Sequence, residues 1–433
     1  MARPGATSIP ESFSFAQWWP RTRTSAFWMV VIAFGLRIAF ILVAHTYRFK
    51  ADQDNFSFGY EMGRIGRALA TGRGFSDPFG AGTGTTAWEA PLYPYLIGGV
   101  FKLTGVYTQA SALILLCINS IFSALTCLAI FAIARKCFSE RVAVWSAWAW
   151  VLLPPVMYWS VRWVWETSLA ALLLAIIFWL TLELEELDGA QPWIAFGLLW
   201  GVAALANTSL LSFLPASGLW AWIRRAKAGR SSLAGVLLSA LFFAATIAPW
   251  LVRNYETFGQ FVFIRSNFGA ELRLGNGPGA DGTWMAYLHP TQNPVALQRY
   301  EEIGELAYVA ERKRQAVEFI RADYSRFAWI SFKRSVYYWG GRPRDSAAAG
   351  VIDNSVFLAS SVLAFWGLGL ALRKRHHGAT LFLLLVLCYP AIFYFVFPHA
   401  RYRHPLEPEL AILIAYVISE ARPKSSLPSP GPV

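Results

Sequence analysis

Apolar runs long enough to cross a bilayer recur along the chain. A hydrocarbon core needs about 20 consecutive, mostly apolar residues per helix. We predict ten spanning segments, at 26–45, 110–134, 142–160, 165–182, 192–206, 208–223, 232–251, 351–372, 379–397 and 405–420. The fifth and sixth are short and are separated only by Asn207, Thr208 and Ser209. They form either a tight helical hairpin or one broken span.

Two long stretches between the predicted spans are more polar and are not low-complexity. They run from 46 to 108 and from 253 to 350. The first contains an apolar stretch, 91–103, that is too short to span and predicts an interfacial or re-entrant helix. The second contains a glycine-rich run, a predicted helix over 293–324 and an amphipathic segment over 327–339. The long stretches favour a reaction chamber over a transporter, since transporters usually combine short loops with internal repeats.

Composition supports a membrane protein. Of the 433 residues, 56% are hydrophobic and only 15% are charged, against about 25% charged in an ordinary soluble domain. One soluble core cannot hide so much apolar surface, and disorder requires low hydrophobicity. The four cysteines lie in or beside apolar segments without zinc or disulfide spacing. The expected fold class is an all-α polytopic membrane protein of about ten helices with two large extracytoplasmic loops.

Lysine and arginine set the orientation, because loops rich in them face the cytoplasm. With ten spans, the basic loops all fall on one side: they contain Arg21, Arg23, Arg135, Lys136, Arg141, Arg224, Arg225, Lys227, Arg230, Arg373, Lys374, Arg375, Arg422 and Lys424. We therefore expect a cytoplasmic segment 1–25, a transmembrane domain 26–422 with outer loops 46–108 and 253–350, and a cytoplasmic tail 423–433. The first span is expected to be a retained signal anchor. The net charge of +12 suggests contact with anionic lipid.

Three carboxylates follow the first span on its outer side, namely Asp52, Asp54 and Glu61. Carboxylates at a membrane surface can deprotonate an acceptor hydroxyl or hold a divalent cation. They can equally be solvated loop acids, and an ion pair between Glu61 and Arg64, three residues apart on a helix, accounts for Glu61 as well. Farther along the same loop, Glu89 precedes a proline-rich turn, for which a rigid loop is the simpler explanation.

Arginines at outer helix ends could bind a phosphate, since the guanidinium group is its preferred bidentate partner. Arg253 and Arg265 flank the outer end of the seventh span. The last outer loop, HARYRH, gathers His399, Arg401, Arg403 and His404, against the usual charge distribution. Ordinary interfacial arginines and a solvated loop are the alternatives. Arg37 lies inside the first span, where it either serves a function or extends its head group to the surface.

These residues resemble a known family. The stretches GYEMGRIGRALATGRGF, PLYP, PWLVRNYETFG and ARYRHPLEPEL, with the acidic stretch after the first span, are similar to the GT-C class of integral-membrane glycosyltransferases. The narrower resemblance is to bacterial glycosyltransferase family 39, relatives of the dolichyl-phosphate-mannose protein mannosyltransferases and the aminoarabinose lipid A transferases.

The resemblance implies transfer of a sugar from a polyprenyl-phosphate donor to a protein, lipid or glycan acceptor at the outer face of the cytoplasmic membrane. It implies a catalytic base in the first outer loop, where Asp54 or Asp52 matches and Glu61 is the rival, although the local pattern is Asp-Gln-Asp where the family has an adjacent Asp-Glu pair. Residues matching donor-phosphate ligands are Arg253, Arg401, Arg403 and His404. We assign further substrate contacts to Glu89, Tyr93 and Arg265.

Two other functions remain open from sequence. One is a transporter or flippase of lipid-linked sugars, which would need more charge within the spans. The other is a glycan polymerase or ligase that uses a diphosphate-linked donor. We expect membrane lipid as a partner and no nucleic acid. No cofactor and no protein metal site is assigned, although the acidic loop is compatible with a divalent cation.

Overall fold

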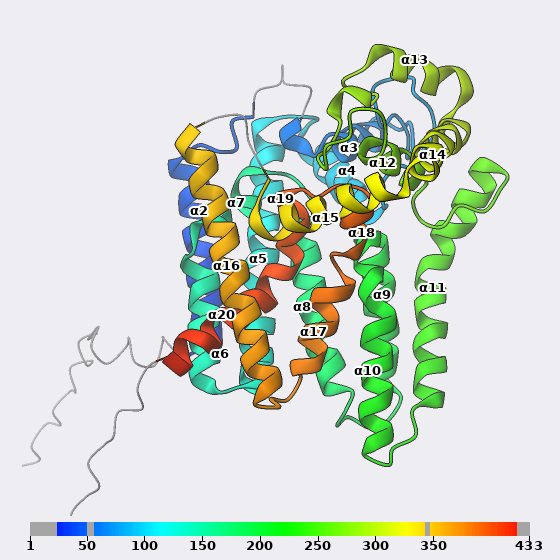
Figure 1. Cartoon of the computed structure of the whole chain (residues 1–433). Coiled ribbons are helices and arrows are strands. Elements are labelled where there is room, and N and C mark those ends of the chain that lie inside the picture. The colour runs from blue at the N-terminus through cyan, green and yellow to red at the C-terminus, as the bar shows by residue number, and fades with distance from the viewer. Residues whose placement is uncertain (1–23, 50–55, 343–346, 422–433) are drawn as a thin grey trace, which may run out of the picture.

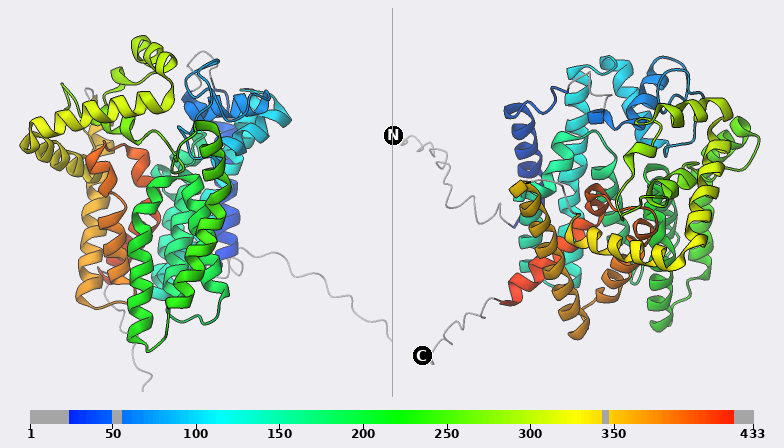
Figure 2. Two further views of the ribbon diagram at one scale, coloured as in Figure 1. Left: turned by 90° about the vertical axis from the view of Figure 1, so that its right-hand side faces the viewer. Right: turned by 45° about the horizontal axis from the view of Figure 1, so that its top comes forward.

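The computed structural model describes residues 24–49, 56–342 and 347–421. Within these ranges the protein consists of helices and loops, with a single isolated bridge between Ser76 and Thr85. Long helices gather in one bundle, and shorter helices cover one end of it (Figure 1). Figure 2 shows the same cap from two further sides. The predicted all-α class is therefore confirmed for the described residues.

Among the described residues, four helices are long and apolar enough to cross a membrane, and a fifth candidate is a bent pair. The four are α2 (Ala26–Val43), α5 (Gln109–Cys137), α11 (Leu233–Phe258) and α16 (Ala347–Arg373); the pair is α6 (Glu140–Leu152) with α7 (Pro154–Arg162). The shorter apolar helices are α8 (Thr167–Glu183), α9 (Gln191–Ala206), α17 (Ala379–Cys388) and α18 (Ala391–Phe395). The number of ten spans stays a prediction.

Prolines break two of the predicted spans. α6 ends before Leu153, which is extended, and Pro154 opens α7 at an angle of 49° to α6. A proline cannot donate the helical hydrogen bond and disfavours the helical conformation in the residue before it. Pro390 lies between α17 and α18, where Tyr389 before it keeps a helical conformation.

The fifth and sixth predicted spans form a hairpin. Between α9 and α10 (Leu214–Lys227) lies the short helix η2 (Thr208–Phe213). At this turn Asn207 donates to Glu166, the residue that precedes α8. At the other end of α10, Arg224 binds Glu185, just after the end of α8. The chain therefore approaches one face of the membrane in α9 and returns in α10.

Arg37 is a structural residue of the bundle. It is fully buried in α2 and faces α5 and α6, where it donates to Ser123 Oγ at 3.0 Å and to the Trp150 carbonyl oxygen at 3.1 Å. A third bond runs to the carbonyl oxygen of Ala33. Because a charge in apolar surroundings needs such acceptors, Arg37 joins three helices and does not extend to the surface.

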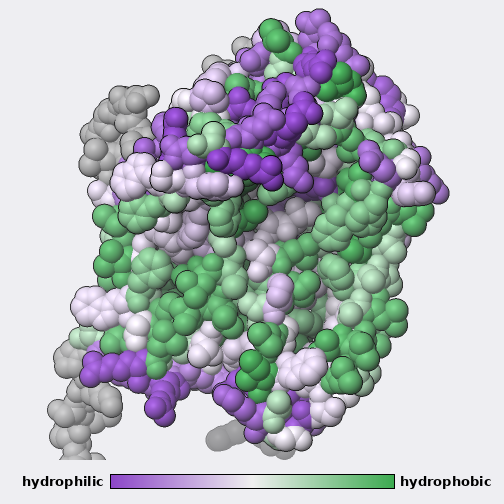
Figure 3. Space-filling view, turned by 45° about the vertical axis from the view of Figure 1, so that its right-hand side comes forward, coloured by the Kyte–Doolittle hydropathy of each residue, from purple (hydrophilic) through white to green (hydrophobic). Residues whose placement is uncertain are grey.

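The cap is built from both long polar stretches. It contains η1 (Phe56–Phe58), α3 (Glu61–Ala70), α4 (Leu92–Thr104), α12 (Phe268–Gly275), η3 (Ala286–Leu288), α13 (Pro294–Ile303), α14 (Glu305–Ala322) and α15 (Tyr324–Gly340). The predicted short helix at 91–103 is α4, and the predicted helix at 293–324 divides at Gly304. Below the cap, hydrophobic side chains dominate the visible surface, whereas the cap is largely hydrophilic (Figure 3).

Hydrogen bonds to Glu305 link the two polar stretches. Its carboxylate accepts from the Ala87 amide and the Ser266 hydroxyl, both at 2.7 Å, and from the hydroxyl groups of Thr86 and Tyr300. Burial raises its pKa, and these donors act in the opposite direction. A buried carboxylate with several donors holds its neighbours in one arrangement.

After α18, the last described elements of the chain are α19 (Ala400–Arg403), η4 (His404–Leu406) and α20 (Glu407–Ala421).

Close packing of α9 against α11 leads to a first prediction. A Cβ added at Gly197 would lie 2.3 Å from the Ser239 carbonyl oxygen, whereas nothing lies within 4 Å of one at Gly218. We expect Gly197→Ala to lower the thermal unfolding temperature because the two helices must separate. Gly218→Ala should leave it unchanged or raise it, since alanine favours a helix by about 1 kcal/mol. Equal effects of the two variants would contradict this packing.

Candidate functional site

A cavity of about 990 Å³ lies where the cap meets the bundle. Its walls come from α3, the loop before α4, α7, the start of α8, η2, α12, α15 and the segment around α19. Four carboxylates line it, together with five arginine and histidine side chains. These are Glu61, Glu89, Glu166 and Glu271, with Arg265, His289, Arg342, His399 and Arg401.

Glu61 and His289 face each other in this cavity. Glu61 opens α3, and its carboxylate lies 3.4 Å from His289 Nε2. The Thr291 amide donates to His289 Nδ1, so the neutral imidazole carries its hydrogen on Nε2, toward Glu61. Burial lowers the pKa of His289, and the negative charge of Glu61 acts in the opposite direction. The neutral form is therefore favoured, and it holds one oxygen of Glu61 in place.

Glu89 and Arg265 form a buried pair. The carboxylate lies 2.9 Å from the guanidinium group, which also donates through Nε to the Trp88 carbonyl oxygen at 3.0 Å. Burial raises the pKa of Glu89 to about 8, even though Arg265 lowers it. Pro91 precedes α4 directly after this turn and fixes the backbone there. The pair closes one wall of the cavity.

Two further carboxylates complete the acidic lining. Glu166 precedes α8 and accepts from the Asn207 amide at 3.1 Å. Glu271 in α12 accepts from the Asn267 amide, also at 3.1 Å. Burial raises the pKa of Glu271 to about 7, the range of an effective general base. The second oxygen of Glu166 is buried and has no hydrogen-bond partner among the described residues.

Arg401 lines the cavity and has no carboxylate partner among the described residues. Its guanidinium carbon lies 3.7 Å from the centre of the Trp165 ring, and one NH₂ group donates to the Tyr402 hydroxyl at 3.3 Å. It forms no ion pair with any carboxylate of the described residues. Stacking on an aromatic ring leaves the donors at the guanidinium edge able to bind an anion. Arg401 is therefore well suited to a phosphate.

Two of the other predicted phosphate ligands point elsewhere. Arg403 is buried, lies 2.8 Å from Glu407 and donates to the hydroxyl groups of Ser360 and Ser361. His404 is buried and stacks on Trp150, with 5.5 Å between ring centres. Neither side chain lines the cavity, so both stabilise the packing of the last helices.

The remaining predicted residues either lie away from the cavity or lie outside the described residues. Arg253 donates to the carbonyl oxygens of Thr86 and Phe75 and joins α11 to the first polar stretch. The Tyr93 hydroxyl is buried and donates to Asn119 at 2.8 Å. Neither side chain lines the cavity. Asp52 and Asp54 lie outside the described residues, so their role as the base stays a prediction.

Sequence reasoning missed Glu166, Glu271 and His289 as site residues. A charge at the start of an apolar helix was a usable signal for Glu166. Glu271 and His289 lie in ordinary polar stretches, and only the fold of the cap brings them to the cavity. Within the described ranges, no group of three or more His, Cys, Asp or Glu is arranged to hold a metal ion. A divalent cation bound with Asp52 or Asp54 stays a prediction.

Comparison with known proteins identifies the fold. Residues 88–252 match the family model of dolichyl-phosphate-mannose-protein mannosyltransferases. The oligosaccharyltransferase of Archaeoglobus fulgidus, solved with zinc and sulfate, aligns with a TM-score of 0.51 at 16% identity, over 90% of this chain and 49% of that one. The same enzyme tethered to an acceptor peptide gives 0.54 at 14% identity, over 94% and 50%. The chain therefore shares the fold of this oligosaccharyltransferase, and part of it matches the mannosyltransferase family model.

The resemblance seen in the sequence agrees with this partial family match and with the shared fold. The chain spans about half the length of the oligosaccharyltransferase chains it matches. ArnT from Cupriavidus metallidurans bound to undecaprenyl phosphate aligns more weakly, with a TM-score of 0.38 at 15% identity, over 94% of this chain and 79% of that one. No curated protein sequence matches the chain.

The raised pKa of Glu89 predicts a dependence of stability on pH. Between its ordinary value of 4.5 and about 8, the folded protein keeps a proton that the unfolded chain releases. Folding is therefore favoured below that range, and the contribution is lost as pH rises through 8, by up to about 1.4 kcal/mol per pH unit. We expect the unfolding temperature of Glu89→Gln to fall less between pH 5 and 9 than that of wild type.

The matched control is Glu318→Gln, whose carboxylate is 68% exposed. Its unfolding temperature should follow the wild-type pH profile. A Glu89→Gln profile identical to wild type would show that Glu89 is ionised throughout this range, as a simple ion pair with Arg265.

Proposed function

We propose that this protein is a membrane glycosyltransferase that transfers a sugar from a polyprenyl-phosphate donor to an acceptor hydroxyl or amide. The observation that carries the proposal is that one cavity contains both several carboxylates and Arg401, whose guanidinium group forms no ion pair with a carboxylate of the described residues. Arg401 offers a phosphate site, and Glu61, Glu166 and Glu271 offer hydrogen-bond acceptors and a base. The family match over residues 88–252 supports the same chemistry.

The cavity also suits a donor with a lipid tail. Tyr158 of α7 and Val356 of α16 line it and are 39% and 46% exposed. Both helices belong to the apolar bundle, so the cavity extends toward its lipid-facing side. A prenyl chain can remain in the bilayer while its phosphate and sugar enter the cavity, which saves the cost of moving the chain through water.

The reaction requires little acid catalysis. The bond that breaks joins the sugar carbon to a phosphate oxygen, and phosphate leaves readily at neutral pH. Arg401 would stabilise the charge that develops on that oxygen. A carboxylate would take the proton from the acceptor as its oxygen or nitrogen attacks the sugar carbon from the opposite face. The aromatic rings of Trp88 and Trp284 line the same space and suit the apolar face of a sugar.

Several residues could be the base. Asp54 and Asp52 match the family position, and Glu61 is the described member of the same stretch. The Glu61 carboxylate lies in the cavity and is oriented by His289. Glu271 is a further candidate because its raised pKa favours proton transfer near neutral pH. Glu89 is held by Arg265, so we assign it a role in shaping the cavity.

We further propose that the cavity faces away from the cytoplasm. In support, the end of the bundle opposite the cavity contains the basic residues Lys136, Arg224, Arg225 and Arg230, as expected for a cytoplasmic face. Ten spans would place both termini in the cytoplasm. The acceptor would then be a protein, lipid or glycan outside the inner membrane. A peptide acceptor has a precedent in the oligosaccharyltransferase that shares the fold.

A transfer assay in lipid nanodiscs tests the activity. Radiolabelled polyprenyl-phosphate sugars are offered with membrane extract, and label on the acceptor is measured for wild type, Asp54→Asn and Glu61→Gln. We expect wild type to transfer label, and the variant that lacks the base to lose at least about 100-fold of the rate. Movement of labelled lipid across the bilayer without consumption of donor would indicate a flippase. Transfer from a diphosphate-linked donor alone would indicate a polymerase or ligase.

Neighbouring arginines provide a sharper prediction. Arg401→Gln removes the proposed phosphate ligand and should reduce transfer about 10- to 100-fold, as expected for a lost charge-assisted hydrogen bond, with little change in unfolding temperature. Arg403→Gln leaves Glu407 without its partner and should lower the unfolding temperature instead. If Arg401→Gln transfers at the wild-type rate, the phosphate binds elsewhere.

A further inference from the structure

A second cavity lies at the opposite end of the bundle. Its volume is about 330 Å³, and its lining includes Arg224, Arg375, His376, His377 and Thr380, without an acidic residue. The 17 residues of α8 separate this end from the first cavity, a distance of about 25 Å. The sugar-transfer site therefore does not account for it.

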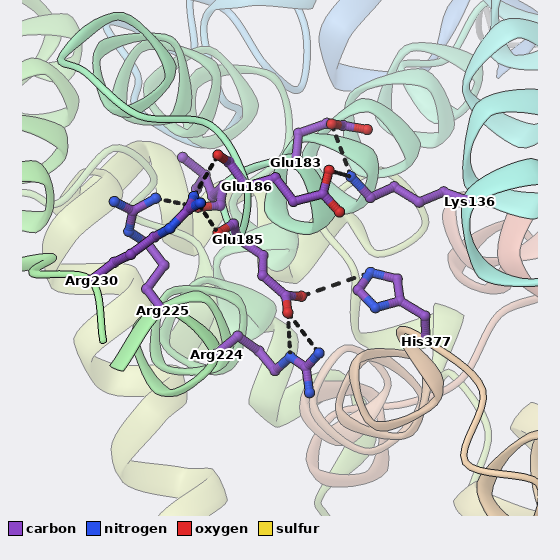
Figure 4. Close-up of polar contacts among 9 residues, drawn as sticks. Lys136, Glu183, Glu185, Glu186, Arg224, Arg225, Arg230 and His377 are labelled. Atoms are coloured by element: carbon purple, nitrogen blue, oxygen red, sulfur yellow. Dashed lines mark hydrogen bonds and ion pairs between the residues drawn. The ribbon is translucent and has the colours of Figure 1, made fainter. Parts of the chain in front are cut away.

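Most cations around this cavity already have partners (Figure 4). Acidic residues at the end of α8 and directly after it provide them: Glu183 binds Lys136, Glu185 binds Arg224, and Asp188 binds Arg225 and Arg230. Glu185 also lies 3.8 Å from His377 Nε2. This network neutralises one side of the cavity and fixes Arg224 and His377 at its wall, so the remaining positive charge belongs to the α16–α17 loop.

Arg375 supplies that charge from an unusual backbone position. It forms no ion pair with a carboxylate of the described residues, and it is exposed. Its φ angle is 54°, and its amide and that of His376 bond back to Leu372 and Ala371. This is the helix-ending motif in which glycine normally occupies the left-handed position. An arginine in this left-handed conformation costs about 1 kcal/mol of folding free energy. The cost is consistent with a functional role for the Arg375 side chain.

The membrane side of the cavity is apolar. Thr380 lines the cavity, and Leu384 and Leu387 follow it on the same stripe of α17, at spacings of four and three residues. Leu387 is 59% exposed, and Leu219 of α10 is 60% exposed. α10 and α17 are packed together. A polar, basic cavity that continues into exposed leucines matches a phosphate head group followed by an acyl chain.

We propose that this cavity binds the phosphate of an anionic phospholipid of the cytoplasmic leaflet, with Arg375 as its principal ligand. The first turn of α17 adds its amide dipoles to this positive end, and His376 and Arg224 line the cavity beside it. An acyl chain lies along Leu384 and Leu387. A general attraction of basic loops to anionic lipid acts on every exposed arginine alike, whereas this site requires Arg375 in particular.

Native mass spectrometry of the full-length protein, extracted in detergent and stripped of lipid, tests the site. Phosphatidylglycerol, phosphatidylcholine and inorganic phosphate are titrated separately into wild type and three variants. Arg375→Gly removes the charge and places the residue favoured at that φ angle, so it should fold at least as well as wild type. Arg375→Lys keeps the charge. Arg373→Gln, the matched control, neutralises an exposed arginine two residues away that does not line the cavity.

We expect the first phosphatidylglycerol to bind wild type, Arg375→Lys and Arg373→Gln with similar affinity, and Arg375→Gly about fivefold more weakly, the effect of one basic residue near a lipid surface. Phosphatidylcholine should bind all four proteins weakly. Equal losses in Arg375→Gly and Arg373→Gln would overturn the site in favour of general attraction. Inorganic phosphate that binds wild type as tightly as phosphatidylglycerol, and displaces it, would overturn the lipid as its source.

Discussion

A guanidinium group held away from water must find hydrogen-bond acceptors or a counter-charge, and the organisation of this protein follows from how its arginines meet that requirement. Arg37, Arg253 and Arg334 donate to backbone carbonyl oxygens of neighbouring segments. Arg403 adds a carboxylate and two hydroxyl groups. Each of these residues joins elements that are distant in sequence. Arg37 and Arg403 hold helices of the bundle together, whereas Arg253 and Arg334 join the cap to the bundle.

Arg401 differs because it is supported by aromatic rings. Trp165 and Tyr402 hold its guanidinium group in position without neutralising it. The nearby carboxylates are instead held by other groups: Arg265 binds Glu89, His289 binds Glu61 and Asn207 binds Glu166. The cavity therefore holds Arg401 close to carboxylates without an ion pair between them, which is the arrangement that a phosphate leaving group and a base require.

The sequence was most informative where a physical effect acts locally. Apolar length predicted the bundle helices, and the prolines at 154 and 390 explain where two of them break. The sequence could not separate Arg401 from Arg403, because both belong to the same basic loop. The short helix α19 separates them: two residues correspond to about 200° of rotation, so one side chain faces the cavity and the other the helix packing. Likewise, Glu271 and His289 reach Glu61 and Glu89 only through the folding of the cap.

The central claim is that Arg401 binds the donor phosphate within the cavity, and a structure of the protein in nanodiscs with a polyprenyl phosphate tests it most directly. The account predicts phosphate density within hydrogen-bond distance of the Arg401 guanidinium group, with the prenyl chain leaving between α7 and α16. Phosphate bound instead beside Arg253 or Arg403, or outside the cavity, would contradict it.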